Sequence, residues 1–320
     1  MVTNVSAVSL ILQGLNLHKV NGRILTMNDY VKEFILKTWG TKDRFPGPQP
    51  ISIEFKHFPI LRNNDYVVCE KTDGVRHMMV ALMYEGKKQC VFVNRNFQMF
   101  SVPLHFKKSI FDGTILDGEL CGETFLVYDT VMVEGKIVGH QNFLDRLDHM
   151  ERVTKGLIGL KSDRVKVKIK KFHVMREFKY FMNDYLPTVK EPIDGLVFTP
   201  INEQVLMGTH ETMFKWKPKE KNTIDFLAKV DERGVWRLYV QDKGKLYMEG
   251  EIPADKVAVT PLLEDGAILE CMYMENDAPM WWKPLLKRED KNYPNNRRTF
   301  YRTLVNIKED IKMNEFLKCT

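Results

Sequence analysis

Short runs of β-branched and aromatic residues, each closed by turn residues, constrain this fold more than any other feature of the sequence. From Asp65 onward such runs recur at short intervals, which favours sheets over a bundle of helices. The runs that we expect to form strands are 66–70, 78–84, 89–93, 114–120, 125–133, 193–199 and 212–216. Apolar residues at helical spacing predict helices at 143–154, 176–186 and 296–307. The fold class that follows is α+β.

The texture of the sequence changes near Thr223, where short strands become separated by frequent turn signals. These are DERG at 231–234, QDKGK at 241–245 and LEDG at 263–266, a spacing typical of a small antiparallel barrel or sandwich. Earlier, the Pro- and Gly-rich stretch FPGPQP at 45–50 is expected to be a connector after an N-terminal segment. The predicted domains are a larger β-rich domain at 1–222, a small all-β domain at 223–295 and a C-terminal helical segment at 296–320.

Composition narrows the class of protein without choosing a function. A formal net charge of +6 and a pI near 8.9 allow a polyanionic partner. The five cysteines form no CxxC pair and no zinc-ligand spacing with a histidine, which fits a reducing compartment. The N-terminus is not a convincing signal peptide, and no apolar run is long enough to span a membrane, so we expect a soluble, intracellular protein. The Walker-type phosphate loop, GxGxxG, HExxH and GxSxG are all missing.

One lysine stands where a nucleophile could be held. Lys71 follows the apolar run Tyr66–Cys69, with only Glu70 between them, and precedes an Asp-Gly turn signal and Arg76, so it should lie at the end of a buried strand. Taken alone, Lys-x-Asp-Gly occurs in many hairpins. Five further short elements follow, and each by itself could be a surface turn or a solvated strand face. They are DGEL at 117–120, LVYD at 126–129, DGLVF at 194–198, KWKP at 215–218 and REDK at 288–291.

Together and in this order, these six elements resemble the collinear motifs of the covalent nucleotidyltransferases, which comprise the mRNA capping guanylyltransferases and the ATP- or NAD-dependent ligases. Two details favour the capping enzymes. The fourth motif begins with Asp194, where ligases usually show Glu-Gly, and the fifth continues as KWKPKEKNTIDF. Length and layout are similar to those of the compact capping enzymes of chlorella viruses. The resemblance also reaches LNLHKV at 15–20 and PGPQPISIE at 46–54, and so covers nearly the whole chain.

The resemblance implies both a fold and a reaction. The fold would be a nucleotidyltransferase domain of the ATP-grasp-like ligase and capping type, joined to a C-terminal OB-fold barrel, with the C-terminal helix returning to the larger domain. Lys71 would attack the α-phosphate of GTP, release pyrophosphate and hold GMP as a covalent lysyl-N-GMP. GMP would then pass to the 5′-diphosphate end of RNA to form the GpppN cap. The alternatives are an ATP-dependent polynucleotide ligase that uses the same lysine and an inactive RNA-binding module.

The resemblance also assigns roles to individual residues. Lys215 and Lys217 would contact the α-phosphate, and Arg288 and Lys291 of the second domain would reach the outer phosphates on closure. Mg²⁺ or Mn²⁺ should be required, with Asp194 as the nearest carboxylate. The residues matched to catalysis are Lys71, Lys215, Lys217, Asp225, Arg288 and Lys291. Those matched to GTP binding are Glu70, Thr72, Asp73, Gly74, Arg76, Arg95, Glu119, Tyr128, Lys170, Asp194 and Asp290.

For the residues matched to GTP binding, the resemblance also indicates which part of the nucleotide each one contacts. Glu119 and Arg76 match positions that hold the ribose hydroxyls, and Arg95 matches an arginine on the phosphates. Tyr128 matches the aromatic on which guanine stacks, which is reasonable because every base offers a π-face. The family has a lysine that reads guanine O6. Lys170 aligns best with it, while Lys168 and Lys171 are adjacent candidates.

The stretch RVKVKIKK at 164–171 is informative in its own right because basic and apolar residues alternate along it. In a strand, Arg164, Lys166, Lys168 and Lys170 would line one face, and the apolar residues would line the other. The basic row is either a solvated strand face or an edge that reads a base or guides RNA.

Capping also needs an RNA triphosphatase and a guanine-N7 methyltransferase, and the sequence carries no signature of either. We expect those activities on separate proteins. We expect this chain to act as a monomer on GTP and 5′-diphosphate RNA, in the nucleus or the cytoplasm of a cell.

Overall fold

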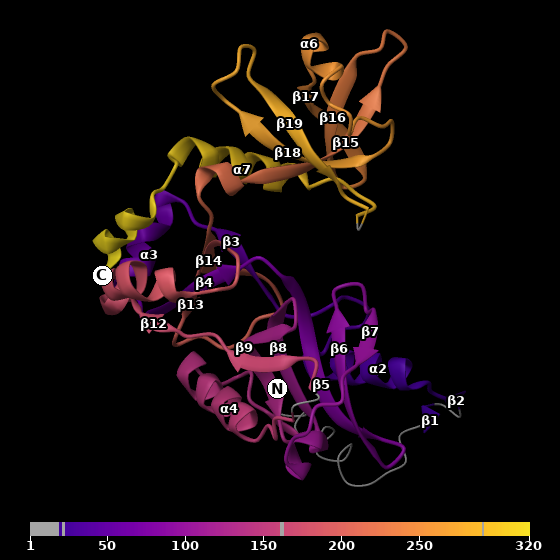
Figure 1. Ribbon diagram of the computed structural model, residues 1–320, viewed down its shortest axis with the longest axis vertical. Coiled ribbons are helices and arrows are strands. Elements are labelled where there is room, and N and C mark those ends of the chain that lie inside the picture. Colours follow the sequence, from indigo (N-terminus) through magenta and orange to yellow (C-terminus); the bar gives the residue numbers. More distant parts are fainter. Residues whose placement is uncertain (1–18, 21–22, 161–162, 290) are drawn as a thin grey trace. The chain divides into compact units, whose positions relative to one another are not determined.

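The structure is a computed structural model that describes residues 19–20, 23–160, 163–289 and 291–320 (Figure 1). Among these, the chain forms two compact units. Unit 1 comprises the residues up to Ile51, Ile60–Lys215 and Thr320, and unit 2 comprises Ser52–Pro59 and Trp216–Cys319. The chain therefore enters unit 2 twice, once briefly and early. The division does not test the predicted domain boundaries, which stay predictions.

Unit 1 is built on a seven-stranded sheet with the order β10-β9-β8-β5-β6-β7 and with β11 beside β9. All neighbouring pairs are antiparallel except β11 with β9, which run parallel. The strands are β5 Val75–Tyr84, β6 Lys87–Asn94, β7 Met99–Ser101, β8 Thr114–Cys121, β9 Thr124–Val133, β10 Lys136–Ile137 and β11 Lys166–Ile169. The five runs predicted as strands between residues 66 and 133 are confirmed to within a few residues.

Each face of this sheet is covered by one long helix. Helix α4 (Phe143–Lys155) packs on the face that carries Phe92 and Phe125, and this face holds the larger apolar cluster. Helix α2 (Met27–Trp39) packs on the other face through Val31 and Ile35. Both helices begin with a polar N-cap whose side chain accepts a hydrogen bond from the backbone N–H three residues later, as a helix start requires. Helix α2 is thus part of the core of unit 1.

A second, five-stranded sheet carries the lysine of the first motif. Its order is β12-β4-β13-β14-β3. The strands are β3 Pro48–Ser52, β4 Tyr66–Thr72, β12 His173–Val174, β13 Ile193–Pro200 and β14 Gly208–Trp216. The predicted connector at 45–50 is wrong in its second half, because Pro48 and Pro50 belong to β3. Strand β3 lies at the sheet edge, where a proline without an N–H can be accommodated.

The helix predicted at 176–186 is helical throughout but changes pitch along its length. It consists of a 3₁₀ turn at Met175–Glu177, α5 at Phe178–Tyr180, a π-turn at Phe181–Tyr185 and a 3₁₀ turn at Leu186–Thr188. The remaining short elements of unit 1 and its flanks are β1 Lys19–Val20, β2 Arg23–Ile24, η1 Phe55–His57, α3 Phe58–Asn63 and η2 Lys108–Asp112.

Unit 2 is a five-stranded antiparallel sheet with the order β17-β16-β15-β18-β19, and its outermost strands β17 and β19 also approach one another. This arrangement is consistent with a partly open five-stranded barrel such as the OB-fold. Its elements are η6 Lys219–Lys221, β15 Thr223–Val230, β16 Trp236–Asp242, β17 Lys245–Glu251, α6 Ala254–Val257, β18 Ile268–Met274, β19 Trp281–Lys287, α7 Arg297–Glu309 and η7 Met313–Cys319. With the two sheets of unit 1, the α+β class is confirmed.

Helix α7 closes the core of unit 2, where Phe300 and Ile307 join the buried cluster of the sheet. The early segment Ser52–Pro59 also binds here. Asn306 Nδ2 donates a hydrogen bond to the Ile53 carbonyl at 2.6 Å, and the rings of Phe58 and Phe316 lie 5.4 Å apart. That residues 296–320 return to the larger domain stays a prediction.

In the described part of the chain, no helix is long and apolar enough to cross a membrane.

Candidate functional site

A pocket in unit 1 lies where the two sheets meet. Both sheets contribute to its walls. The lining residues are Pro48, Pro50, Cys69, Lys71, Arg76, Arg95, Glu119, Tyr128, Asp129, Lys170, Phe172, Val197, Thr199 and Met213. Six of the residues proposed from the sequence are therefore brought together in one pocket: Lys71, Arg76, Arg95, Glu119, Tyr128 and Lys170.

Lys71 lies near the end of β4, as its place before the Asp-Gly turn predicted, and its side chain is 24% exposed. Its Nζ donates a hydrogen bond to Asp194 Oδ1 at 2.8 Å. Asp194 lies in a β-bulge where β13 pairs with β4. Ile193 pairs with Thr72 and Gly195 pairs with Lys71, so Asp194 is the extra residue of the bulge. Bulges commonly re-aim a side chain beside a functional site. The amine is thus held by a nearly buried carboxylate.

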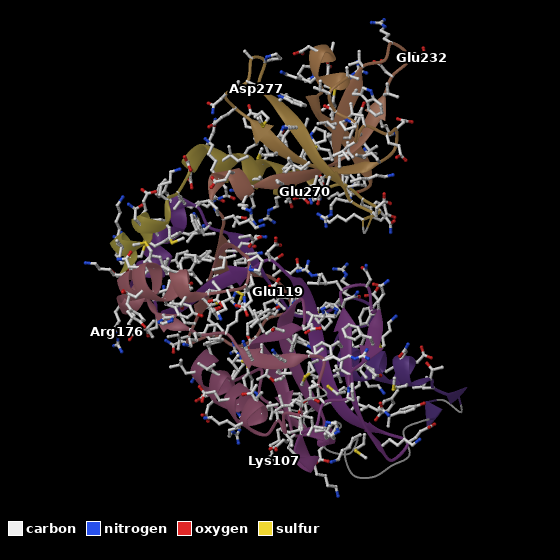
Figure 2. The ribbon with its side chains drawn as sticks, in the orientation of Figure 1. Lys107, Glu119, Arg176, Glu232, Glu270 and Asp277 are labelled. Carbon is white, nitrogen blue, oxygen red and sulfur yellow. The ribbon has the colours of Figure 1, made fainter. Side chains whose placement is uncertain are left out.

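Beside Lys71, three polar side chains form a chain of hydrogen bonds. Lys170 is 6% exposed, and its Nζ donates to the Thr72 hydroxyl at 2.8 Å and to the Glu70 carbonyl at 3.0 Å. The Thr72 hydroxyl donates in turn to Glu119 Oε2 at 2.5 Å. Glu119, labelled in Figure 2, projects from β8 in the other sheet. The chain of bonds fixes Lys170 and Glu119 relative to the strand that carries Lys71.

Arg76 is anchored by a buried acid that sequence reasoning did not single out. Arg76 Nε donates to Asp117 Oδ1 at 3.0 Å and Nη2 donates to Oδ2 at 2.5 Å, while Nη1 donates to the Pro48 carbonyl. Burial works against the charged guanidinium, but Asp117 raises the pKa of Arg76 above its ordinary value. Gly47 leaves room for this contact, because a Cβ there would lie 2.1 Å from Arg76 Nη2 and its φ is +107°.

Tyr128 is also aimed by a bulge. Asp117 pairs with Asp129 and Gly118 pairs with Val127, so Tyr128 is the extra residue of β9 and lines the pocket. Burial raises the pKa of Tyr128 well above its ordinary value, so its ring is neutral. Lys170 Nζ lies 6.0 Å from the ring centroid. An aromatic face and a cation therefore border the same part of the pocket.

The pocket contains a second potential nucleophile, Cys69, two residues before Lys71. Burial raises the pKa of the Cys69 thiol to about 12, so the thiol stays protonated at neutral pH. Lys71 is the better placed of the two for covalent chemistry. Cys69 carries no motif, and its position in the pocket follows from β4 alternation, because residues 69 and 71 share one face.

Other predicted residues lie near the pocket without lining it. The Glu70 carboxylate turns to the other side of β4, where burial raises its pKa and Tyr185 donates a hydrogen bond to it at 3.3 Å. Asp73 and Gly74 form the turn after β4. The residues that sequence reasoning missed are Asp117, Asp129, Arg146, Phe172, Val197, Thr199 and Met213. Asp117, Asp129 and Val197 stood inside recognised motifs, which was a usable signal, and the others had none.

A second cluster of predicted residues lies within unit 2. Asp225 is nearly buried in β15 and pairs with Arg288 at 3.1 Å and with Lys291. Arg288 Nη1 also contacts Glu270 at 3.0 Å. Lys217 belongs to this unit as well, and Lys215 is the last residue of unit 1 before it. Asp290 lies outside the described residues, as do the first four residues of LNLHKV.

The described residues contain no cluster of three or more His, Cys, Asp or Glu side chains that could form a metal cage. A magnesium ion in a nucleotide site often takes only one or two carboxylates and completes its shell with phosphates and water. Asp194, beside Lys71, is a donor of that kind.

Sequence comparison finds similarity to mRNA-capping enzymes. The chain is 28% identical to the mRNA-capping enzyme of Danio rerio over 78% of this chain and 45% of that protein. It is also 28% identical to the mRNA-capping enzyme subunit alpha of Schizosaccharomyces pombe over 90% of this chain and 83% of that protein. The chain thus spans about half the length of the animal relatives that it matches.

Among solved structures, a chain described under the structure and function of Lig E DNA ligases matches 75% of this chain and 99% of its own length, with 14% identity and a TM-score of 0.36. That score is too low to support a conclusion. The family model "mRNA capping enzyme, catalytic domain" matches residues 14–219, which is more than half of the chain. On that match, which includes every residue of the pocket, the chain belongs to the mRNA capping enzyme family.

Proposed function

We propose that this protein is an mRNA guanylyltransferase that forms a lysyl-N-GMP on Lys71 and transfers the GMP to 5′-diphosphate RNA. The observation that carries the proposal is the position of Lys71: it lines the pocket of unit 1, contacts Asp194, and shares the pocket with Arg76, Glu119 and Lys170. Membership of the capping family supports the choice of GTP and RNA as substrates.

In this mechanism Lys71 is the nucleophile. A lysine amine must lose its proton before it attacks phosphorus. Asp194 accepts a hydrogen bond from Lys71 Nζ and so holds the amine at one place in the pocket. The bond that forms joins Nζ to the α-phosphorus, and the bond that breaks releases pyrophosphate. Because charge builds up on the phosphate oxygens, catalysis depends mostly on position and on nearby cations.

The base and sugar would be held by the residues around Tyr128. Its ring offers a stacking face for guanine. Lys170 Nζ donates two hydrogen bonds to the protein, to Thr72 and to the Glu70 carbonyl, and lies 3.8 Å from Glu119 Oε2, beyond hydrogen-bond distance. We assign its third ammonium donor to an acceptor such as guanine O6. This supports Lys170 over Lys168 and Lys171, because the latter two are exposed and do not line the pocket. Glu119 and Arg76 remain our proposal for the ribose.

The phosphates would meet cations from several elements. Arg95 lines the same pocket, and Lys215, Lys217, Arg288 and Lys291 follow the family motifs for the α-, β- and γ-phosphates. Asp225 would hold Arg288 and Lys291 together until phosphate oxygens compete for them. Mg²⁺ or Mn²⁺, held by Asp194 and the substrate, would neutralise phosphate charge.

The test is to incubate the protein with GTP labelled at the α-phosphate, with Mg²⁺ or Mn²⁺, and to separate the products under denaturing conditions. We expect label on the protein with GTP, none with ATP, and none with Lys71→Ala. Lys71→Arg is the matched control, since it keeps a cation at Asp194 but cannot act as the nucleophile, and it should also stay unlabelled. Addition of 5′-diphosphate RNA should move the label from protein to RNA.

Two results would count against the proposal. Label with ATP alone would indicate a polynucleotide ligase that uses the same lysine. Absence of label with either nucleotide would leave only the fold and an RNA-binding role. The expected separate triphosphatase and methyltransferase, the viral origin and the monomeric state stay predictions of the same proposal.

A further inference from the structure

The proposed function uses Lys170 but leaves the rest of its basic stretch without a role. Arg164, Lys166 and Lys168 are all exposed. In the part of the chain that the structure describes, none of the three makes an ion pair or a side-chain hydrogen bond. They are hereafter called the basic row.

The basic row lies on the same face of the sheet as the pocket. Val167 and Ile169 pack against the apolar cluster on the α4 side, so Lys166 and Lys168 point to the other side of β11. Lys168 pairs in register with Leu126 of β9, and Leu126 pairs with Glu119 of β8, which lines the pocket. Residues that face one another across paired strands project from one face of a sheet.

The row also leads into the pocket along its own strand. The backbone N–H groups of Lys166 and Lys170 donate hydrogen bonds to the carbonyls of Glu123 and Val127, beside and in β9. The strand geometry therefore continues as far as the buried Lys170. Alternate residues of a strand lie about 6.6 Å apart. Lys166, Lys168 and Lys170 therefore form a line of cations that begins in solvent and ends, at Lys170, inside the pocket. Arg164 lies in the bend that precedes β11.

We infer that the basic row binds the phosphodiester backbone of the acceptor RNA and directs its 5′ end into the pocket. The inference rests on the proposed function and names the route that its second substrate takes. The chemistry of the surface favours a flexible polyanion, because three exposed cations lie within five residues of the described chain and none of them pairs with a carboxylate. Sequence-independent phosphate contacts of this kind suit an enzyme that must accept every transcript.

A row of lysines on an outer strand has a second possible role, which is to prevent edge-to-edge pairing with another chain. Strand β11 pairs with β9 on one side, and within the described residues no strand pairs with its other side. Under that role, loss of the charges would cause self-association and would leave RNA binding unchanged. The two roles therefore predict different measurements.

The experiment compares two triple variants of the full chain that lose the same charge. The test variant is Arg164→Ala, Lys166→Ala, Lys168→Ala. The control variant is Lys87→Ala, Lys107→Ala, Lys108→Ala, which removes three exposed lysines, and Figure 2 shows Lys107 far from Glu119. Adduct formation with labelled GTP is measured first. Transfer of GMP from the purified adduct is then followed with a 5′-diphosphate oligoribonucleotide and with a 5′-diphosphate dinucleotide, each at low and at moderate salt.

We expect both variants to form lysyl-GMP at the wild-type rate. The test variant should raise the KM for the oligoribonucleotide about tenfold or more at low salt, and should lower the salt slope of RNA affinity by about two, since each single-strand phosphate contact contributes ~0.7. Transfer to the dinucleotide should change little, because it is too short to occupy the row. The control variant should behave as wild type in every assay.

Equal KM values for the two triple variants would overturn the inference, and so would self-association of the test variant with unchanged RNA affinity. A wild-type protein that forms no lysyl-GMP would instead refute the proposed function. Loss of binding to an acidic peptide without any change in RNA transfer would assign the row to a protein partner and would also overturn the inference.

Discussion

The hydroxyl of Thr72 connects two charged groups of opposite sign, Lys170 and Glu119, whose Nζ and Oε2 atoms lie 3.8 Å apart. It accepts a hydrogen bond from Lys170 Nζ and donates one to Glu119 Oε2. Hydrogen bonds to charged groups contribute about 1.5–3 kcal/mol. Because the hydroxyl serves both neighbours, its loss would leave Lys170 with only its bond to the Glu70 carbonyl and would take from Glu119 the donor at Oε2.

We therefore expect Thr72→Val to raise the KM for GTP in adduct formation by about 10- to 100-fold, which corresponds to roughly 1.5–3 kcal/mol. Preference for GTP over ATP should also fall, since Lys170 would lose one of the two hydrogen bonds that orient its ammonium toward a guanine acceptor. The measurement is the rate of lysyl-nucleotide formation against nucleotide concentration, with both nucleotides. Thr72→Ser, which keeps the hydroxyl, is the control and should stay near wild type. A Thr72→Val protein that matches Thr72→Ser would show that the hydroxyl holds neither group in place.

Individual residues also mark how far sequence reasoning reached. Lys71 was predicted at the end of a buried strand because a turn signal follows an apolar run, and that position is confirmed. The alternation at 164–171 predicted which residues share a face but not that Lys170 alone is buried. Its burial depends on β4 and β8 lying across from it, which are contacts distant in sequence. The pairing of Arg76 with Asp117 has the same cause.

At the scale of elements, α4 is attached to the sheet by one buried ion pair. Arg146 is 2% exposed, and its Nε and Nη2 donate to the two oxygens of Asp129 at 2.8 and 3.1 Å. Nη1 donates to the carbonyls of Gln141 and Glu203. The Arg146 guanidinium thus bonds to three separate segments of the chain, at Asp129, Gln141 and Glu203. Asp129 also lines the pocket, so the pair connects the helix to the site.

Arg146→Met should lower the free energy of unfolding by about 3–5 kcal/mol, because Asp129 would keep a buried charge without a partner. Urea titration monitored by circular dichroism measures this. Arg152→Met on the exposed side of the same helix is the matched control and should change the stability by less than about 0.5 kcal/mol. Equal effects of the two substitutions would mean that the helix is held by its apolar face alone.

The regular elements were the predictable ones, for a physical reason. Strands and helices whose apolar residues recur at a constant period, such as the helix Phe143–Lys155, can be predicted from that spacing. The segment 175–188 does not keep a single pitch, since it passes from 3₁₀ to α to π geometry. The bulges at Asp194 and Tyr128 likewise depend on the partner strand and leave no local mark in the sequence.

At the scale of the whole molecule, a short segment from early in the sequence belongs to unit 2, which is otherwise built from the C-terminal part of the chain. Ser52–Pro59 belongs to unit 2, where Phe58 is 6% exposed and packs against Phe316. The backbone N–H of Phe55 donates to Glu309 at 2.8 Å. No composition shift in the sequence announced this, because the segment lies among residues that otherwise build unit 1.

Phe58→Ala should therefore destabilise unit 2 by about 3 kcal/mol, the lower end for an aromatic truncated in a core, and should leave unit 1 almost unchanged. Hydrogen exchange, followed by mass spectrometry of peptides from β15 and from β5, separates the two units. Phe55→Ala is the matched control: its side chain is 39% exposed and its backbone contact remains, so it should have little effect. Faster exchange in β5 would assign the segment to unit 1 instead.

The same early segment has a consequence for synthesis on the ribosome. Unit 1 has nearly all of its residues once Lys215 has emerged, whereas Ser52–Pro59 must wait for Trp216–Cys319 before it meets its partners. At about 5–20 residues per second, the roughly 100 residues that remain take on the order of 5–20 s. During that interval Ile53 and Phe58 lack their native cover, so the nascent chain exposes an apolar peptide next to a unit that can already fold.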